Sequence, residues 1–389
     1  MSFNYLVLGA GRQGTAAAYD MVRWGESRRV ILADQDLERA ERATDRVRRL
    51  TGRSSIEAME VDATDLERVA LALRAADSFL SAVPYSLNLE ITKAAIWSKT
   101  SMCDLGGNLE MARRQHGFDG EARNAGISII PNCGQVPGMG TALMVYAMEL
   151  LDEPEEVFMW DGGLPQKPRP PFHYLLTFHV AGLTNEYAEP AVFLRDGKIT
   201  EVEPLTELET VSFPDPIGTL EAFVTGGGTD TMPWTYQGRL KTLQNLTLRH
   251  PGHFAQLRAF YDLGLWSLAP IDAGGVSVVP RQVFHVLFEP KVTFPSDRDL
   301  VIVRVKALGK KDGRNAEAAV EVIDSFDEET GFTAMERSTG WSAAIVAEMM
   351  ARGDTPLGAG GVERQVPAKP FVEELRRRGI PVNEELAFR

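Results

Sequence analysis

The chain has 389 residues, a formal net charge of −13 and an apolar content of 44%. This length is long for a single core, so we expect two domains. The acidic balance argues against nucleic acid or an anionic membrane surface as a partner. No apolar run approaches the roughly 20 residues that cross a bilayer. The N-terminus enters its first predicted strand without room for a signal peptide, so we expect a cytoplasmic protein.

The cysteine and histidine pattern does not suggest a disulfide framework or a metal centre. The two cysteines, Cys103 and Cys133, each lie at the end of a predicted strand, and neither a CxxC pair nor a cluster of histidines occurs. We therefore interpret both cysteines as small buried apolar side chains and expect no metal ligands.

The first turn of the chain has the pattern of a phosphate-binding loop. An apolar run at 5–8 predicts a strand, Gly9, Gly11 and Gly14 follow in G-x-G-x-x-G spacing, and a helix is predicted over 12–23. In this pattern the first glycine permits a tight turn, the second admits the pyrophosphate, and the third lets the helix pack on the strand. The helix N-terminus then attracts the phosphates. The predicted contacts include Arg12 and Gln13, and a simple glycine turn is the alternative interpretation.

A carboxylate at the end of the second predicted strand decides between the two nicotinamide dinucleotides. The apolar run 30–33 ends at Asp34, 20 residues after Gly14, and the next basic residue is Arg39. A carboxylate here accepts hydrogen bonds from both ribose hydroxyls and repels a 2′-phosphate, for which an NADP site usually offers an arginine. The sequence therefore predicts NAD as cofactor.

Strands and helices alternate through residue 130. Further strands are predicted over 57–61, 78–83, 101–104 and 127–130, and further helices over 36–50, 66–75, 87–97 and 117–125. This repetition predicts an α/β fold with a Rossmann-type, doubly wound parallel sheet, whose ligand lies at the carboxyl ends of the strands. The cofactor contacts predicted at those ends are Asp62, Ala63, Ala82, Val83 and Pro84.

After about residue 150 the pattern predicts a mostly antiparallel, sheet-rich α+β domain. Its predicted strands are 156–160, 172–180, 191–203, 208–213, 219–225 and 243–249, with a hairpin of 299–308 and 315–324 around a turn at 309–313. Its predicted helices are 253–263 and 280–288, and the tail returns to helix over 340–352 and 370–378.

Motifs spread over nearly the whole chain resemble the saccharopine dehydrogenase family. They are Ala82-Val83-Pro84-Tyr85, Pro131-Asn132-Cys133-Gly134-Gln135-Val136-Pro137-Gly138-Met139, Trp160-Asp161-Gly162-Gly163-Leu164-Pro165, Gly182-Leu183-Thr184-Asn185-Glu186-Tyr187 and Arg195-Asp196-Gly197-Lys198. The resemblance implies an amino-acid dehydrogenase that acts at a C–N bond and assembles as a homo-oligomer, a dimer or a dimer of dimers. It also implies a nucleotide domain of residues 1–130 and 336–389, with the C-terminal helices packed back, and a substrate-binding and dimerisation domain of residues 131–335.

Other segments resemble the family members that oxidise the side-chain amine of L-lysine with NAD, giving a semialdehyde that cyclises to piperideine-6-carboxylate. These segments are Cys103-Asp104-Leu105-Gly106-Gly107, Leu220-Glu221-Ala222-Phe223, Gly226-Gly227-Gly228-Thr229 and Leu248-Arg249-His250-Pro251-Gly252-His253. Saccharopine-cleaving relatives have an Asp and an Arg where this chain has Val136 and Gly228, which favours a substrate with fewer carboxylates. Saccharopine, a polyamine conjugate, and a non-catalytic NAD-binding sensor or scaffold remain alternatives.

The resemblance and the chemistry together predict the substrate contacts. Arg249 matches a position that contacts the substrate carboxylate in saccharopine-cleaving relatives, and a guanidinium binds a carboxylate bidentately. Hydride leaves a carbon only when the neighbouring amine is neutral, so a base is needed. The base candidates, in order, are His179, Tyr85, Asp104 and Tyr174, although lysine-oxidising relatives can have His near Leu176 instead. The other predicted substrate contacts are Thr247, Gly106, Gly107 and Gly227. Exposed or core roles remain open for these residues, and His253 is alternatively a cap of helix 253–263.

Overall fold

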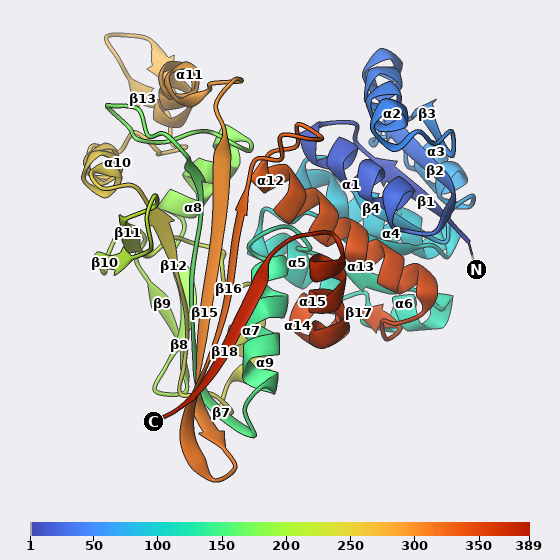
Figure 1. Cartoon of the computed structure of the whole chain (residues 1–389). Helices are drawn as coiled ribbons and strands as arrows, with labels where there is room; N and C mark the ends of the chain where they lie inside the picture. The colour runs from blue at the N-terminus through green and yellow to red at the C-terminus, as the bar shows by residue number, and fades with distance from the viewer. Residues whose placement is uncertain (1) are drawn as a thin grey trace.

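The computed structural model describes residues 2–389 and contains two large sheets (Figure 1). The first is a seven-stranded parallel sheet in the order β17-β6-β5-β4-β1-β2-β3. Its strands are β1 (Phe3–Leu8), β2 (Ser27–Asp34), β3 (Ile56–Glu60), β4 (Ser78–Ser81), β5 (Ser101–Asp104), β6 (Ser128–Ile130) and β17 (Gly358–Ala359). The helices between them are α1 (Arg12–Arg23), α2 (Leu37–Thr51), α3 (Leu66–Leu73), α4 (Asn88–Ser98), α5 (Leu109–His116) and α6 (Asp119–Ala125).

This strand order is that of the doubly wound dinucleotide-binding fold, so the predicted fold class is confirmed. The central strands β1 and β2 are buried on both faces, as expected for strands with continuous apolar runs. The chain order reverses between β1 and β4, and the loops that follow these strands flank the position where such folds bind a ligand.

The second sheet is mixed and runs β10-β11-β12-β7-β15-β16-β18, with the β8–β9 hairpin attached to β12. The pair β7–β12 is parallel, and the other described pairs are antiparallel. The strands are β7 (Glu153–Pro165), β8 (Ala191–Arg195), β9 (Lys198–Val202), β10 (Glu209–Ser212), β11 (Thr219–Phe223), β12 (Thr242–Arg249), β15 (Asp299–Lys311), β16 (Arg314–Ser325) and β18 (Val382–Phe388). The predicted sheet-rich second domain is thereby confirmed.

Several predicted elements of this region were wrong in detail. The predicted strand 172–180 is an irregular segment that leads into α8 (Val180–Ala188), so His179 caps a helix instead of lying on a strand. The apolar residues there are buried without strand pairing, and the consecutive residues Tyr174, Leu175 and Leu176 are all buried. The predicted range 191–203 divides into β8 and β9 at Asp196-Gly197, where both residues have positive φ angles. The long hairpin turns at Asp312-Gly313, later than predicted.

Other helices were not expected from the sequence, or were expected with other bounds. The range 117–125 contains only α6, and α5 precedes it. The remaining helices are α7 (Met139–Glu149), α9 (Met232–Tyr236), α10 (His253–Asp262), α11 (Pro280–Val292), α12 (Ala334–Glu336), the π-helix η2 (Arg337–Trp341), α13 (Ser342–Arg352), α14 (Val362–Gln365) and α15 (Ala368–Arg377).

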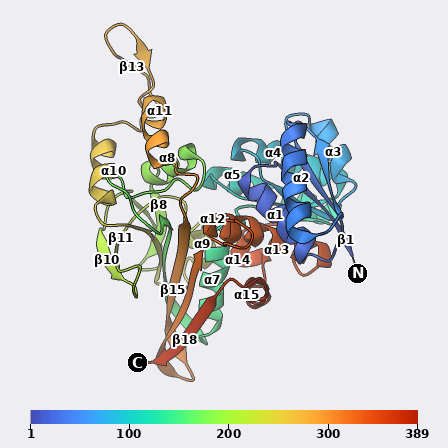
Figure 2. The same cartoon turned by 45° about the horizontal axis from the view of Figure 1, so that its top comes forward.

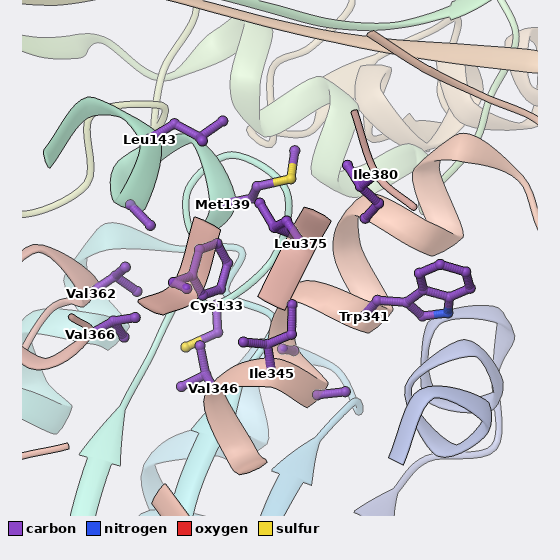
Figure 3. Packing of buried hydrophobic residues seen from close by; sticks show 14 of the residues in the cluster. Cys133, Met139, Leu143, Trp341, Ile345, Val346, Val362, Val366, Leu375 and Ile380 are labelled. Atoms are coloured by element: carbon purple, nitrogen blue, oxygen red, sulfur yellow. The ribbon is translucent and has the colours of Figure 1, made fainter. Parts of the chain in front are cut away.

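The C-terminal tail contributes to both sheets. Helix α13 packs on β4 and β5, and β17 pairs with β6, whereas β18 pairs with β16 of the second sheet. The sequence analysis assigned all of residues 336–389 to the nucleotide domain and did not anticipate this last strand. Figure 3 shows Ile345, Val346 and Leu375 of the tail packed around Met139 of α7 and Cys133. Helix α7 therefore lies in one continuous core between the two sheets.

A smaller part of the second domain projects away from both sheets. It consists of α10, α11 and a short hairpin of β13 (Ile271–Asp272) and β14 (Ser277–Val278), which extends furthest in Figure 2. We call residues 253–292 the arm. Over residues 2–389, none of the helices combines the length and apolar content that a membrane crossing requires.

Candidate functional site

The glycine loop after β1 has the geometry of a phosphate cradle. A Cβ on Gly9 would lie 2.6 Å from the carbonyl oxygen of Ala82, and a Cβ on Gly14 would overlap the carbonyl oxygen of Gly9. These two glycines are therefore required by the protein's own packing. Gly11 differs, because a Cβ there would meet nothing within 4 Å. Gly11 caps α1 without a side-chain hydrogen bond, so the first N–H groups of α1 are free for an anion.

Asp34 lies beside this loop at the end of β2. Its carboxylate accepts hydrogen bonds from the backbone N–H of Ala10 at 2.8 Å and of Asp36 at 3.0 Å. Arg39 of α2 approaches the Asp34 carboxylate to 3.8 Å. A carboxylate oxygen can accept more than one hydrogen bond, so Asp34 keeps capacity for ribose hydroxyls. The nearby Arg39 partly neutralises it.

The other predicted cofactor residues lie around the same edge of the sheet. Asp62 and Ala63 directly follow β3, and the Asp62 carboxylate accepts hydrogen bonds from the backbone and side chain of Thr64, which lower its pKa. Ala82, Val83 and Pro84 follow β4, where Ala82 donates to the carbonyl of Leu8. Arg12 is directed to the tail, with its Nε 2.7 Å from Glu336, and Gln13 has a buried, unpartnered Oε1.

Asp104 at the end of β5 is buried and ties neighbouring loops together. It accepts hydrogen bonds from Gly106 N at 2.8 Å, Asn132 N at 3.0 Å and Gln115 Nε2 at 2.8 Å. Burial raises its pKa, and these hydrogen bonds oppose the rise. A carboxylate so fully occupied serves as a structural anchor, and its use as a mobile base would break the anchor.

The network continues from Asp104 into the second domain. Asn132 donates its side-chain N–H to Asp230 at 2.7 Å, and the other oxygen of Asp230 is buried without a partner. Burial and the nearby Glu363 carboxylate raise the pKa of Asp230 well above its usual range. The loop 226–231 is therefore fixed to the edge of the nucleotide sheet.

Tyr85, Gly106 and Gly107 lie together at this edge. A Cβ on Gly107 would lie 3.0 Å from the Tyr85 ring, so the glycine permits the tyrosine to cover the loop. Burial lowers the pKa of Arg281 of α11, and the nearby Glu189 carboxylate and Tyr85 phenol oppose this lowering. These residues therefore face the second domain.

Arg249 at the end of β12 is the centre of a buried polar cluster. Its Nε donates to the Tyr187 hydroxyl at 2.8 Å and its Nη1 to the carbonyl of Leu248 at 2.9 Å, and it lies over the rings of Tyr174 and Tyr187. Glu186 approaches Nη2 only to 3.9 Å. Two of the five N–H donors of this guanidinium form the hydrogen bonds described, so donors remain for a ligand.

Two carboxylates share the surroundings of Arg249. Asp161 of β7 is paired in register with Thr247 of β12, so both project from the same face as Arg249, two residues further along. Burial raises the pKa of Asp161 to about 6, against the lowering effect of Asn245, Arg249 and Gln135. Burial raises the pKa of Glu186 to about 8, the nearby Asp161 adds to the rise, and Arg249 opposes it. Glu186 keeps 34% of its side-chain surface exposed, which limits the effect of burial there.

The histidines and the tyrosine considered as site residues lie in different surroundings. His179 is exposed and its Nδ1 accepts a hydrogen bond from Ala181 N. Tyr174 is buried beneath Arg249, and burial raises its pKa. His253 does begin α10, yet its ring bonds the Tyr187 hydroxyl at 2.9 Å, and burial lowers its pKa to about 3. His250 contacts the carbonyl of Pro165 at 2.9 Å.

The remaining substrate-side predictions concern β12 and the glycine loop before it. Thr247 is buried and its hydroxyl lies 2.7 Å from that of Thr225. Gly227 has a positive φ angle and free space around it. At Gly228, a Cβ would overlap the side-chain amide of Asn245, so a larger residue at this position would require Asn245 to move. Leu176 is part of the apolar core of the second domain.

Sequence reasoning did not single out Asp161, Glu186 or Tyr187 as site residues. All three belong to motifs that were noted for their resemblance to the family, which was the available signal. The catalytic assignments of His179, Tyr85, Asp104 and Tyr174 stay predictions. Cys103 and Cys133 are free and buried, as predicted. Within residues 2–389 no group of three or more His, Cys, Asp or Glu side chains is arranged to hold a metal ion.

A parallel dinucleotide-binding sheet joined to a sheet-rich second domain defines a class of two-domain, nicotinamide-dinucleotide-binding proteins. Residues 5–130 match the saccharopine dehydrogenase NADP binding domain, and residues 134–380 match the saccharopine dehydrogenase C-terminal domain. The chain belongs to the saccharopine dehydrogenase family.

Individual relatives are distant. The chain is 22% identical over 386 residues to the mitochondrial alpha-aminoadipic semialdehyde synthase of Bos taurus, with 81% of this chain and 41% of the relative covered. It is 22% identical to the Rattus norvegicus protein of the same name, with 79% and 40% covered. The chain thus spans about two fifths of these relatives. It is similar in fold to the apo saccharopine dehydrogenase (L-Glu forming) of Saccharomyces cerevisiae, at 18% identity, a TM-score of 0.77, and coverage of 99% of this chain and 100% of that chain.

Proposed function

We propose that this protein is an NAD-dependent dehydrogenase that oxidises the side-chain amine of L-lysine to the 6-semialdehyde, which cyclises. The observation that carries this proposal is the enclosed Arg249 with unused donors and Glu186 at 3.9 Å. A guanidinium and a neighbouring carboxylate are complementary to the α-carboxylate and α-ammonium of an amino acid. The reacting end of the substrate then extends toward the loops after β5 and β6.

The small size of the expected substrate is supported at Gly228. Saccharopine has two carboxylates more than lysine, and each buried carboxylate needs a cation or several hydrogen-bond donors. An arginine in place of Gly228 would overlap the side chain of Asn245, which lies next to this position. Saccharopine cleavage is the second candidate, because the family membership and the fold are compatible with it.

An absorbance assay at 340 nm tests the reaction directly. Purified protein is mixed with NAD and, separately, with L-lysine, saccharopine and a polyamine conjugate. Formation of NADH with lysine alone supports the proposal, and formation with saccharopine alone replaces it by the second candidate. Cofactor binding without turnover of any amine identifies the protein as a non-catalytic sensor or scaffold.

NAD, rather than NADP, is our proposed cofactor, although the matching family model is named for NADP. Asp34 supports NAD, because a 2′-phosphate would face a carboxylate, while Arg39 nearby reduces that repulsion. We expect kcat/KM to be higher with NAD, and the double variant Asp34→Ala, Gln35→Arg to reverse the preference. Better turnover of wild type with NADP contradicts this assignment.

We also propose, as expected from the sequence, a cytoplasmic homo-oligomer that binds a small amino acid and neither nucleic acid nor membrane. The bovine and rat relatives are named as mitochondrial proteins, so location is to be measured by fractionation.

A further inference from the structure

We infer that Asp161 binds the side-chain amine of the substrate and accepts its proton before hydride transfer. This inference rests on the proposed function and adds a residue that sequence reasoning did not identify. It also assigns the orientation of the substrate between Arg249 and the nucleotide domain.

The buried carboxylate of Asp161 has few hydrogen-bond donors. Only 7% of its surface is exposed, and its Oδ1 is buried without a hydrogen bond. Its Oδ2 receives one long hydrogen bond, from Gln135 Nε2 at 3.5 Å, and the side chain of Asn245 lies close enough to lower the pKa of the carboxyl. Leaving a buried carboxylate oxygen unpaired costs about 1–3 kcal/mol or more. Such an arrangement is retained where a ligand supplies the missing donor.

Asp161 and Arg249 lie at different distances from the nucleotide domain. Asp161 contacts Gln135, which belongs to the loop directly after β6 of the nucleotide sheet, whereas Arg249 contacts α8 and lies next to the arm. Thr247 is the register partner of Asp161, so Arg249 is displaced by two residues along the neighbouring strand. Two residues of a strand span about 6.6 Å. Arg249 and Asp161 are thus separated along the sheet, with Asp161 nearer the predicted nicotinamide position.

The charges around Asp161 are complementary to an ammonium group. The charged and titratable groups that face Asp161 are Arg249, Glu186 and Tyr187. A substrate carboxylate bound by Arg249 neutralises the positive charge of the cluster. The negative charges of Asp161 and Glu186 then need other cations. An α-ammonium at Glu186 and a second ammonium at Asp161 complete the balance. A second carboxylate at the Asp161 end would be repelled, so the site takes an α-amino acid with a distal amine.

The step balances without another reagent. The ammonium R–CH₂–NH₃⁺ gives one proton to the Asp161 carboxylate and becomes R–CH₂–NH₂. The neutral amine has the lone pair that forms the C=N bond, and a bound NAD would supply the acceptor for the carbon's hydride. Hydrolysis of the resulting R–CH=NH₂⁺ by one water gives the aldehyde R–CHO and ammonium, and Asp161 returns its proton to solvent. Asp161 is the base in place of His179.

The experiment compares wild type, Asp161→Asn and the control Glu156→Gln, which removes a carboxylate from the same strand beside Thr242. Calorimetry measures the binding of L-lysine and of L-norleucine, which lacks the amine, in the presence of NADH, with which lysine cannot react. Hydrogen bonds to charged groups contribute about 1.5–3 kcal/mol, which is roughly 10- to 150-fold. We expect wild type and Glu156→Gln to prefer lysine by this factor and Asp161→Asn to lose the preference.

The pH dependence provides a second readout. Only the ionised carboxylate attracts the ammonium, so the lysine-to-norleucine ratio in wild type should fall as the pH drops through about 6, the pKa of Asp161. Norleucine shares the α-amino-acid head group, so titration of Glu186 cancels in the ratio. In Asp161→Asn the ratio should be flat, and kcat/KM for lysine should fall about 10²- to 10⁴-fold.

The outcomes separate the two proposals. Turnover of lysine by wild type, with the ratio unchanged in Asp161→Asn, overturns the role of Asp161 and leaves the proposed function standing. An Asp161-dependent preference for lysine without any turnover supports the recognition and overturns the proposed reaction. If Asp161→Asn does not fold, the wild-type ratio decides, and a constant ratio from pH 5 to 8 overturns the inference.

Discussion

The three glycines of the phosphate loop differ in what surrounds them. Gly9 and Gly14 are confined by backbone carbonyls, whereas a methyl group on Gly11 would enter empty space. The backbone angles of Gly11, φ −72° and ψ −171°, are also accessible to any residue. The protein itself therefore gives no reason for a glycine at position 11, and a ligand lying against the backbone does.

Gly11→Ala and Gly14→Ala should consequently fail in opposite ways. We expect Gly11→Ala to keep the wild-type melting temperature and to weaken NAD binding strongly, because its methyl group occupies the pyrophosphate position. Gly14→Ala should lower the melting temperature, since α1 must move away from Gly9. Differential scanning fluorimetry with and without NAD measures both effects. Unchanged NAD affinity in Gly11→Ala would remove the cofactor from this loop.

Arg249→Ala should raise KM for lysine while leaving NAD affinity intact. Truncating one partner of a buried charge pair typically costs about 2–5 kcal/mol, or roughly 30- to several-thousand-fold in affinity. Arg249→Lys keeps the charge without the bidentate geometry and should recover only part of the loss. Steady-state kinetics with a calorimetric titration of NAD measures this. A KM within threefold of wild type in Arg249→Ala would make the arginine purely structural.

At the residue scale, the sequence pattern was sufficient to place the predicted cofactor residues after the strands of the first sheet and Arg249 at the end of β12. Their periodic context determines where they lie, because parallel strands end at a common edge. It failed for Asp161 and Glu186, whose surroundings depend on the pairing of β7 with β12 and on α8. Neither the register between distant strands nor the irregular segment before α8 can be read from local periodicity.

At the scale of elements, a buried ionic cluster fixes α15 to the nucleotide sheet. Arg378, which follows α15, bonds Asp20 of α1 at 2.7 and 2.9 Å and Glu348 of α13 at 2.7 Å. All three side chains have no exposed surface. Two carboxylates thus share one arginine in the core. Burial raises the pKa of Glu348 to about 8, with a further rise from the adjacent Asp20, while Arg378 opposes both.

This cluster should make the free energy of unfolding fall as the pH rises from about 4 to about 8. A carboxyl whose pKa is raised by folding contributes stability below its unfolded pKa, about 4.3 for Glu, and that contribution is lost as pH rises toward the folded pKa. Glu348→Gln keeps an acceptor for Arg378 and has no proton to lose. We expect its free energy of unfolding relative to wild type to become more favourable from pH 6 to pH 9. Urea denaturation at the two pH values measures the difference, and a constant difference would mean that Glu348 is ionised in the fold.

At the scale of the whole molecule, the alternation of strands and helices was sufficient to predict the parallel sheet, and the loss of that alternation predicted the second domain. The division of the tail between the two sheets was not predictable. Strand β18 is separated from β16 in the sequence by α13 and α15, and six of its seven residues are exposed, so no apolar pattern marks it. Its place depends on tertiary pairing with a long neighbour.

The arm is the part of the molecule that supports the proposed homo-oligomer. Its α11 exposes Val286 at 74% and Leu287 at 61%, and the hairpin region adds Leu268 at 67% and Ile271 at 53%. Apolar surface gathered on one projecting segment is typical of an interface, and a second copy of the chain is the partner that we expect. Val286→Glu places a charge within this surface and should shift the protein toward monomer.

Leu71 of α3 provides the matched control, because it is 68% exposed and lies on the nucleotide domain away from the arm. Leu71→Glu should keep the wild-type mass in light scattering and sedimentation, while Val286→Glu should approach 42.8 kDa, the mass of one chain. Burying an apolar side chain contributes about 1.5–3 kcal/mol, and a C₂ interface includes each residue twice, so the weakening is doubled. If wild type is already monomeric at micromolar concentration, the homo-oligomer is excluded. If both variants keep an oligomeric mass, the interface lies elsewhere than the arm.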